Sequence, residues 1–402
     1  MKLRQLCSAA RRPTAVPRHH CLRRAAPPLL LILTSLLVAV SARAGNYLVY
    51  VGTYDTPKTK GIYAFRFTTE TGQATAPSLV AEITNPTFLE LHPEGPFLYA
   101  VNEIGRFRDK DAGAASAFRI DKQTGRLALL NQVSSVGAGP CHLAVDRTGH
   151  CLVVANYGGG SVAAFPIKND GSLGEATSFF QHQGKSVNAQ RQQGPHAHGV
   201  TFDPAEKFAF VPDLGTDKIM IYRLDARAAK LTPNDPPAAS LPPGSGPRHL
   251  AFHPNGRFAY AVNELASTVT VFAFDEARGS LTERQTISTL PDGFSGNSTT
   301  AEIAVHPRGK FLYVSNRGYD SIAAFGIARN GTLKRLDHVS TQGKTPRHFA
   351  IDPTGEWLWA GNQGTDTLVL FRIDPKAGTL LPGGQALELG APVCVKYLAL
   401  TP

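Results

Sequence analysis

The sequence predicts an all-β protein, a seven-bladed β-propeller whose last blade is closed by strands from the two ends of the chain. Three observations support this prediction. A motif of 19 to 21 residues recurs six times at intervals of 46 to 55 residues, and a period of this length is typical of propellers and solenoids. Each copy belongs to a unit of four short, alternating apolar segments without a 3.6-residue periodicity. The chain ends together supply the strands of one further unit.

Each copy of the motif reads as two strands joined by a tight turn. The copies are NPTFLELHPEGPFLYAVNE (85–103), GPCHLAVDRTGHCLVVANY (139–157), GPHAHGVTFDPAEKFAFVPDL (194–214), GPRHLAFHPNGRFAYAVNE (246–264), TTAEIAVHPRGKFLYVSNR (299–317) and TPRHFAIDPTGEWLWAGNQ (345–363). A third apolar run such as TVTVFAF and a more polar fourth run such as LTERQTIS follow. In the turns, Pro presets φ, so we interpret His92, His253 and His306 as turn residues and not as metal ligands.

The two ends of the chain complete the seventh unit. Residues 46–67, NYLVYVGTYDTPKTKGIYAFRF, match the second and third strands of a unit, whereas residues 391–400, APVCVKYLAL, match only a first strand. Joining them closes the ring and leaves no free sheet edge. We therefore predict one domain over residues 46–402 and, because no edge needs a partner, a monomer.

Residues 1–44 have the pattern of a signal peptide. A basic stretch precedes the apolar run PPLLLILTSLLVAV, and Ala42-Arg43-Ala44 follows as a cleavage site. We predict cleavage after Ala44 and export to a periplasm or to the outside, with no membrane attachment afterwards; an uncleaved anchor is the alternative. The paired arginines lack the surroundings of a twin-arginine signal, which leaves the export route open.

Removal of this leader changes the charge balance and the number of cysteines. Eight of the 41 basic residues and none of the 31 acidic residues lie in it, so 33 basic residues remain against 31 acidic ones. This balance gives no reason to expect a nucleic acid partner. Cys141, Cys151 and Cys394 remain, and the hairpin register does not place Cys141 opposite Cys151, so we expect free thiols and not a disulfide.

The start and the end of each motif meet at one mouth of the central channel. Arg248 and Glu264 lie eight residues on either side of Gly256, and in an antiparallel hairpin such positions share one end. The predicted mouth residues are Asn102, Glu103, Cys141, His142, Asn156, Tyr157, His196, His198, Asp213, Arg248, His249, Asn263, Glu264, Glu302, Asn316, Arg317, Arg347, His348, Asn362, Gln363 and Lys396. The insertion at residues 181–193 is expected to overhang the same rim. Such a convergence of polar groups predicts a functional site.

Residues that break the repeat are the stronger functional candidates. Only the third unit has PHAH, which contains His196 and His198, and only the fifth has Glu302 and Arg317 at its ends. Histidines that recur at one position, His142, His249 and His348, are expected instead to tie neighbouring blades by hydrogen bonds.

Cofactor chemistry has little support in the sequence. His196 and His198 are spaced to share one face of a strand and could hold zinc, but no third ligand is apparent, and we expect no metal. No GxSxG elbow and no phosphate-binding loop is present, and we expect no cofactor.

Five motifs resemble a known family over essentially all of residues 46–402. They are VGTY (51–54), RQ (191–192) followed by PHAH, GPRH (246–249) with NE completed sixteen residues after Arg248, AEIAVHPRGKFLYVSNRG (301–318) and PVCVKYL (392–398). They resemble the bacterial lactonases of the seven-bladed propeller type, the 6-phosphogluconolactonase family, to which the fungal carboxymuconate lactonizing enzyme is related.

The resemblance implies a lactone hydrolase and a set of catalytic residues. By motif these are Glu264, Arg248, Arg317 and His198, with His196 as the alternative histidine. Opening a lactone needs an activated water, a stabilised oxyanion and a protonated leaving oxygen. We expect Glu264 to act as base if burial offsets the effect of Arg248 on its pKa, the two arginines to bind anionic oxygens, and His198 to donate the proton.

Further contacts to the small-molecule lactone are expected from mouth residues of other blades. These substrate-binding candidates are His196, Glu302, Arg347, Asn362 and Gln363. The predicted export departs from the cytosolic place of a phosphogluconate pathway, which points to an unphosphorylated aldonolactone or another organic-acid lactone. The competing hypothesis is a non-enzymatic exported propeller that binds a protein or a glycan, because propellers host both kinds of function.

Overall fold

Seven antiparallel sheets make up the part of the chain that the computed structural model describes, residues 45–400. The predicted signal peptide, 1–44, lies outside the described residues. Between residues 45 and 400 no helix is long and apolar enough to cross a membrane. The innermost strands of blades 3 to 7 contact one another in succession, and so do those of blades 1 and 2; the innermost strand of the last blade contacts that of the first. The predicted seven-bladed propeller is therefore confirmed.

Each blade has four principal strands, numbered here from the channel outward. Blades 1 to 3 contain β5 (Leu89–Leu91), β6 (Phe97–Asn102), β7 (Ala114–Ile120), β8 (Leu127–Ser134); β9 (Pro140–Val145), β10 (Cys151–Asn156), β11 (Ser161–Pro166), β12 (Ser178–Gln181); and β13 (Thr201–Phe202), β14 (Phe208–Asp213), β15 (Lys218–Asp225), β16 (Lys230–Ser240). Blades 4 to 6 contain β17 (Pro247–Phe252), β18 (Phe258–Asn263), β19 (Thr268–Asp275), β20 (Ser280–Ser288); β21 (Thr299–Val305), β22 (Phe311–Arg317), β23 (Ser321–Ile327), β24 (Leu333–Ser340); and β25 (Pro346–Ile351), β26 (Trp357–Asn362), β27 (Thr367–Ile373), β28 (Leu380–Glu388).

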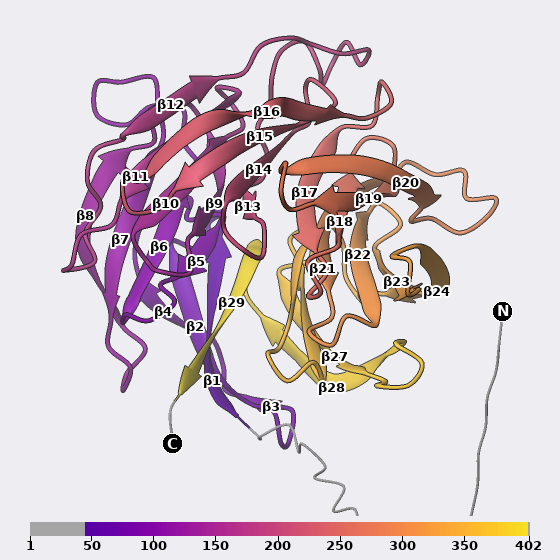
Figure 1. Ribbon diagram of the computed structural model, residues 1–402. Coiled ribbons are helices and arrows are strands. Elements are labelled where there is room, and N and C mark those ends of the chain that lie inside the picture. Colours follow the sequence, from indigo (N-terminus) through magenta and orange to yellow (C-terminus); the bar gives the residue numbers. More distant parts are fainter. Residues whose placement is uncertain (1–44, 401–402) are drawn as a thin grey trace, which may run out of the picture. The chain divides into compact units, whose positions relative to one another are not determined.

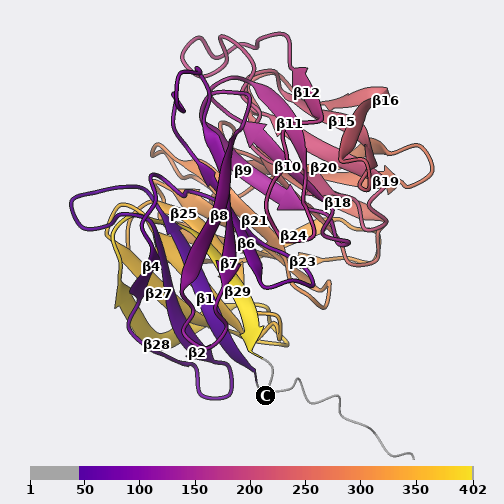
Figure 2. The ribbon, with the colours of Figure 1, turned by 90° about the vertical axis from the view of Figure 1, so that its left-hand side faces the viewer.

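Blade 7 is built from both ends of the chain, as predicted. Its order is β29 (Pro392–Leu400), β1 (Asn46–Thr53), β2 (Ile62–Thr68) and β3 (Gln73–Ala74), with β4 (Ser78–Ala81) also paired to β2. Strands β29 and β1 pair antiparallel from Asn46↔Leu400 to Thr53↔Pro392. Figures 1 and 2 both show the yellow β29 beside the indigo β1. Backbone hydrogen bonds therefore join the first and last described strands and close the ring.

The hydrophobic core lies between blades, because both faces of each sheet are covered. The second strand of a blade is buried at every position in β6, β10, β14, β18 and β26. Apolar clusters draw their members from adjacent blades; the one across the closure joins Trp357 and Trp359 of blade 6 with Tyr47, Phe65 and Phe67 of blade 7. Closure of the ring thus depends on packing as well as on strand pairing.

Two kinds of hydrogen bond recur between neighbouring blades, at the junctions 7–1, 1–2, 4–5 and 5–6. The turn histidines place Nε2 near a glycine carbonyl of the following blade: His92–Gly149 at 3.2 Å, His253–Gly309 at 2.9 Å and His306–Gly355 at 2.9 Å. Buried tyrosines donate to glycine carbonyls in the same way: Tyr50–Gly125, Tyr99–Gly171, Tyr260–Gly331 and Tyr313–Gly378. The HPxG motif therefore combines a turn with a contact between blades, and the contact could not be inferred from the turn pattern.

The cysteines remain free thiols, as expected from the hairpin register. Cys141, Cys151 and Cys394 are all buried and unpaired within the described residues.

Candidate active site

Four residues from three blades meet around one carboxylate at the channel mouth. Oε2 of Glu264 lies 3.0 Å from Nη2 of Arg317 and 3.2 Å from Nε of Arg248. The same oxygen lies 4.0 Å from Nε2 of His198. The structure thus brings together the four residues that the sequence analysis grouped as catalytic candidates, and Glu264 is at the centre with only 2% of its surface exposed.

A β-bulge sets the direction of the Arg248 side chain. Pro247 pairs with Asn263 and His249 pairs with Val262, so Arg248 is the extra residue of β17. Arg248 and Glu264 are therefore not paired in the ladder, but they share one end of the hairpin, as expected, and their side chains meet. Bulges re-aim side chains in this manner. The pairing of β25 shifts in the same way between Pro346 and His348, at Arg347.

Arg191 is a site residue that the sequence analysis did not single out. It comes from the insertion before blade 3, and its Nη2 lies 2.7 Å from Oε1 of Glu264 and 3.1 Å from the hydroxyl of Tyr157. The RQ motif contained it, but an insertion has no equivalent in the other blades, so repeat position could not place it at the mouth.

Two aspartates hold the insertion and the PHAH segment in place. Asp217 accepts hydrogen bonds from Gln192 Nε2 at 2.9 Å and from the backbone N–H groups of Gly244 and Gly246 at 2.7 and 2.6 Å. It thereby links the neighbour of Arg191 to the turn that precedes Arg248. Asp213 accepts from the backbone N–H of His196 at 2.9 Å, which anchors PHAH.

The charge state of Glu264 contradicts its expected role as a base. Burial by itself would raise its pKa, but Arg317, Arg248 and Arg191 outweigh burial and lower the pKa from 4.5 to about 2. Glu264 was expected to act as a base only if burial offset the effect of Arg248 on its pKa, and burial does not. A carboxylate that is ionised and bound by three guanidiniums orients these groups and is a weak proton acceptor.

The same shift predicts how Glu264 contributes to stability. Because its pKa is lower in the folded protein, its stabilisation is fully present above about pH 4.5 and is lost as the pH falls toward about 2. We expect the free energy of unfolding of the parent and of Glu264→Gln to differ most near neutral pH and to converge in acid. Urea unfolding at a series of pH values measures this; a difference that does not change with pH would contradict it.

The histidine expected to donate a proton is neutral. Burial, and after it the charge of Arg248, lowers the pKa of His198 well below 6.5. The expectation of a pKa near working pH is therefore wrong. Nδ1 of His198 lies 3.6 Å from Sγ of Cys141, and the ring meets Tyr157 edge-on at 5.2 Å. The ring of His196 also contacts Tyr157: the two rings are stacked, with 4.6 Å between their centroids.

Two of the expected substrate-binding residues lie close to this cluster. Oε2 of Glu302 lies 3.1 Å from Nδ1 of His249 and 3.5 Å from Nε2 of His348. Arg347 places Nη2 3.2 Å from the hydroxyl of Tyr54. Proximity to Arg347 also contributes to lowering the pKa of Arg248 to about 10, after the larger effect of burial. Four arginines, Arg191, Arg248, Arg317 and Arg347, thus face three carboxylates, those of Glu264, Glu302 and Glu103, which leaves a net positive charge among these side chains.

Asn362, another expected substrate-binding residue, makes a structural hydrogen bond. Its side chain is fully buried and donates to the carbonyl of Thr341 at 3.0 Å. Asn102, Asn156 and Asn316 make the same kind of bond to Thr84, Ser135 and Thr289. The asparagine thus has a structural role in these four blades, whereas Asn263 of blade 4 donates to the hydroxyls of Thr268 and Thr270. Gln363, the next residue, is half-buried, and among residues 45–400 no hydrogen bond joins its side chain to the arginines.

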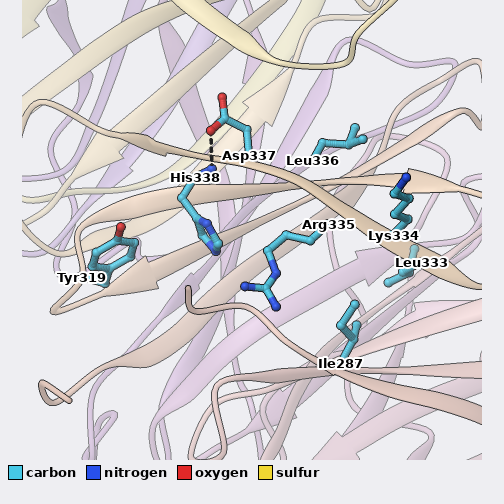
Figure 3. Close-up of a pocket in the computed structure, with 8 residues that line it drawn as sticks. All are labelled: Ile287, Tyr319, Leu333, Lys334, Arg335, Leu336, Asp337 and His338. Carbon is cyan, nitrogen blue, oxygen red and sulfur yellow. Dashed lines mark hydrogen bonds between the residues drawn. The ribbon is translucent and has the colours of Figure 1, made fainter. Parts of the chain in front are cut away.

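A groove of about 750 Å³ lies elsewhere, along β24 on the outer edge of blade 5 (Figure 3). Two of its polar side chains are already engaged: Nη2 of Arg335 lies 3.0 Å from Asp292, and Nε2 of His338 lies 2.9 Å from the Thr289 carbonyl. Within the described part of the chain, no group of three His, Cys, Asp or Glu side chains is placed to hold a metal ion.

Comparisons with known proteins agree with this fold and site. Residues 48–397 match the family described as "Lactonase, 7-bladed beta-propeller". The chain is 39% identical to the 6-phosphogluconolactonase of Bacillus subtilis, covering 88% of this chain and 99% of that protein. It is 36% identical to the 6-phosphogluconolactonase of Formosa agariphila, covering 83% and 94%. The structure of the periplasmic gluconolactonase of Pseudomonas aeruginosa aligns with a TM-score of 0.83 at 36% identity, covering 89% and 100%.

The propeller and these relatives together define a lactonase, a carboxylic ester hydrolase. The chain belongs to the lactonase family of seven-bladed β-propellers. Membership decides between the two functional hypotheses, because it favours an enzyme over a non-enzymatic binding propeller.

Proposed function

We propose that the protein hydrolyses a sugar or organic-acid lactone that carries an anionic group, in the manner of a 6-phosphogluconolactonase, at the mouth of its channel. The observation that supports this proposal is the arginine cluster. Arg191, Arg248 and Arg317 surround Glu264, and Arg347 adds a further positive charge. An anionic ligand would balance this excess, and guanidiniums bind carboxylate and phosphate with paired hydrogen bonds.

The arginines also suit the chemistry of ester opening. Attack of water on the lactone carbonyl develops negative charge on its oxygen, and fixed donors in a buried site stabilise that charge. Nε of Arg317 is buried and donates no hydrogen bond within residues 45–400, whereas Nε of Arg248 faces Oε2 of Glu264 at 3.2 Å. Glu264 holds these guanidiniums in position. We expect the ring N–H of the neutral His198 to hydrogen-bond the ring oxygen as it leaves.

Replacing Arg317 tests anion recognition. Arg317→Ala removes a guanidinium whose side chain is 14% exposed, compared with 3% for Arg248, so it is the more accessible of the two. We expect KM for an anionic lactone to rise about tenfold, the effect of losing one charged hydrogen bond, with a smaller change for a neutral lactone. Steady-state kinetics on both substrates measures this, and equal losses on both would count against anion recognition.

The decisive test of the proposed function is hydrolysis of a small lactone panel. Acid release in a pH-stat would be followed with gluconolactone, its 6-phosphate and a carboxylate-bearing lactone, using the parent and Glu264→Gln. Hydrolysis above the buffer rate that Glu264→Gln loses supports the proposal. If the parent hydrolyses none of the panel faster than Glu264→Gln, the proposal fails.

The place of action is part of the same proposal. We infer a periplasmic or secreted protein from the leader-like pattern of residues 1–44, and similarity to a periplasmic gluconolactonase supports it. Outside the cytosol an unphosphorylated lactone is the more accessible substrate.

A further inference from the structure

Three histidines occupy the same repeat position and surround one aromatic ring at the floor of the mouth. His142, His249 and His348 belong to blades 2, 4 and 6, and their ring centroids lie 3.9, 6.1 and 5.7 Å from that of Phe88. His142 and His348 behave as the sequence analysis expected. Nδ1 of each accepts the backbone N–H of the next blade, from Val200 and Val395, both at 3.3 Å.

His249 lacks this backbone contact and is bound to a carboxylate instead. Its Nδ1 lies 3.1 Å from Oε2 of Glu302. Ile303 is the residue of blade 5 at the repeat position of Val200 and Val395, and its N–H donates to Oε1 of Glu302 at 3.2 Å. Glu302, the acid that only blade 5 has at the repeat position of the three histidines, therefore binds both Nδ1 of His249 and the N–H of Ile303. It replaces the direct hydrogen bond between ring and backbone that the other two histidines make.

This difference assigns the protons on the three rings. An ionised carboxylate only accepts hydrogen bonds, so Nδ1 of His249 carries the proton and Nε2 keeps its lone pair. In His142 and His348, Nδ1 is the acceptor, so the proton is on Nε2. Consistent with this, Nε2 of His348 lies 3.5 Å from Oε2 of Glu302. His249 is thus the member of the three whose Nε2 can accept a proton.

Burial keeps His249 neutral, and the Glu302 carboxylate 3.1 Å from Nδ1 would stabilise the charged ring that forms once Nε2 takes a proton. Burial, and after it the charge of Arg248, lowers the pKa of His249 well below 6.5. Nη1 of Arg248 lies 3.3 and 3.4 Å from the two ring nitrogens and 2.6 Å from the Ala301 carbonyl. Because the first two distances are nearly equal, Nη1 does not lie along the lone pair of Nε2. The titratable groups facing the ring are Glu302, Arg248, Arg347, Lys396, Glu264, His142, His198 and His348.

We propose that His249, positioned by Glu302, is the general base of lactone opening, an inference that rests on the proposed function. Nε2 removes a proton from water as the water oxygen bonds to the lactone carbonyl carbon. The carbonyl electrons move onto the oxygen, which the arginines hold. When the carbonyl re-forms, the bond from carbon to ring oxygen breaks, and the proton on Nε2 passes to that oxygen. One water is consumed, His249 returns to its starting state, and the product is a hydroxy acid.

The test compares His249→Gln with His142→Gln, a matched replacement at the same repeat position. We expect kcat to fall on the order of 10²-fold or more in His249→Gln, the size of a general-base contribution, with KM little changed. We expect His142→Gln to keep kcat close to the parent value. Thermal melts of all variants establish that they are folded.

A second variant separates positioning from a structural role. Glu302→Gln removes the charge that favours protonation of His249, so the rise of kcat with pH should move to lower pH and the plateau should fall, again without a matching change in KM. The inference is overturned if His249→Gln retains the kcat of His142→Gln, or if Glu302→Gln leaves the plateau of kcat unchanged. If His249→Gln does not fold, the plateau value of kcat in Glu302→Gln tests the inference instead. A parent that hydrolyses no lactone would instead refute the proposed function.

Discussion

We expect Glu264→Gln to lower lactone turnover by at least about 10²-fold, the scale associated with loss of transition-state stabilisation at an oxyanion site. The amide cannot balance Arg191, Arg248 and Arg317, which are held by the carboxylate at 2.7 to 3.2 Å. Without that negative charge we expect the three guanidiniums to repel one another and to move away from the carbonyl oxygen of the substrate. Acid release at saturating lactone, followed in a pH-stat, measures the loss of turnover. Circular dichroism with a thermal melt establishes whether the variant is folded.

The repeat supplies a matched control for this variant. Glu103 ends the first motif as Glu264 ends the fourth, but its carboxylate binds the hydroxyls of Tyr54 and Thr87, at 2.8 and 2.6 Å, and no arginine within the described residues. Glu103→Gln removes a carboxylate at the same repeat position and should cause a clearly smaller loss. Equal losses in the two variants would show that any acid at the mouth suffices, which contradicts a specific role for Glu264.

We expect Trp359→Ala to lower the free energy of unfolding by about 3–5 kcal/mol, the usual range for removing a large buried aromatic side chain. Trp359 is fully buried in β26 and meets Phe65 and Phe67 of blade 7 edge-on, at 5.3 and 5.8 Å. The cavity left behind lies between the last blade and its neighbour. Equilibrium unfolding in urea, with refolding verified, measures the change in free energy.

Two further variants separate packing from other effects. Trp359→Phe should cost less, because the Nε1–H of Trp359 is buried without a hydrogen-bond partner within residues 45–400. Leu381→Ala, in the outer strand of the same blade, changes a side chain that is 49% exposed and should alter stability by no more than about 0.5 kcal/mol. A loss as large in Leu381→Ala as in Trp359→Ala would contradict the packing argument.

The residues of the site show where repeat reasoning succeeded and where it failed. It grouped Arg248, Glu264 and Arg317 correctly in space, because equivalent positions of a repeat occupy equivalent places in a ring. It failed for Arg191, which has no repeat position. It also included Asn362, although an asparagine at this position in several motifs already indicated a structural role.

The chemistry of the site depended on distances that no pattern encodes. Burial and Arg248 shift the pKa of Glu264 in opposite directions, and the sequence does not show which of the two effects is larger. The contacts with Arg317 and Arg191 decide that the pKa is lowered. The three equivalent histidines look alike in sequence, and only the carboxylate of Glu302 distinguishes the tautomer of His249.

The sequence alone determined the sevenfold repeat, the shared closing blade and the identity of the side chain at each mouth position, because strand alternation and turn residues are local signals. Only the tertiary structure decided which of these side chains are charged, which donate and which accept. Those properties arise between blades more than fifty residues apart in the chain, as Arg248 and Ala301 are, and pKa values and hydrogen-bond partners depend on such contacts.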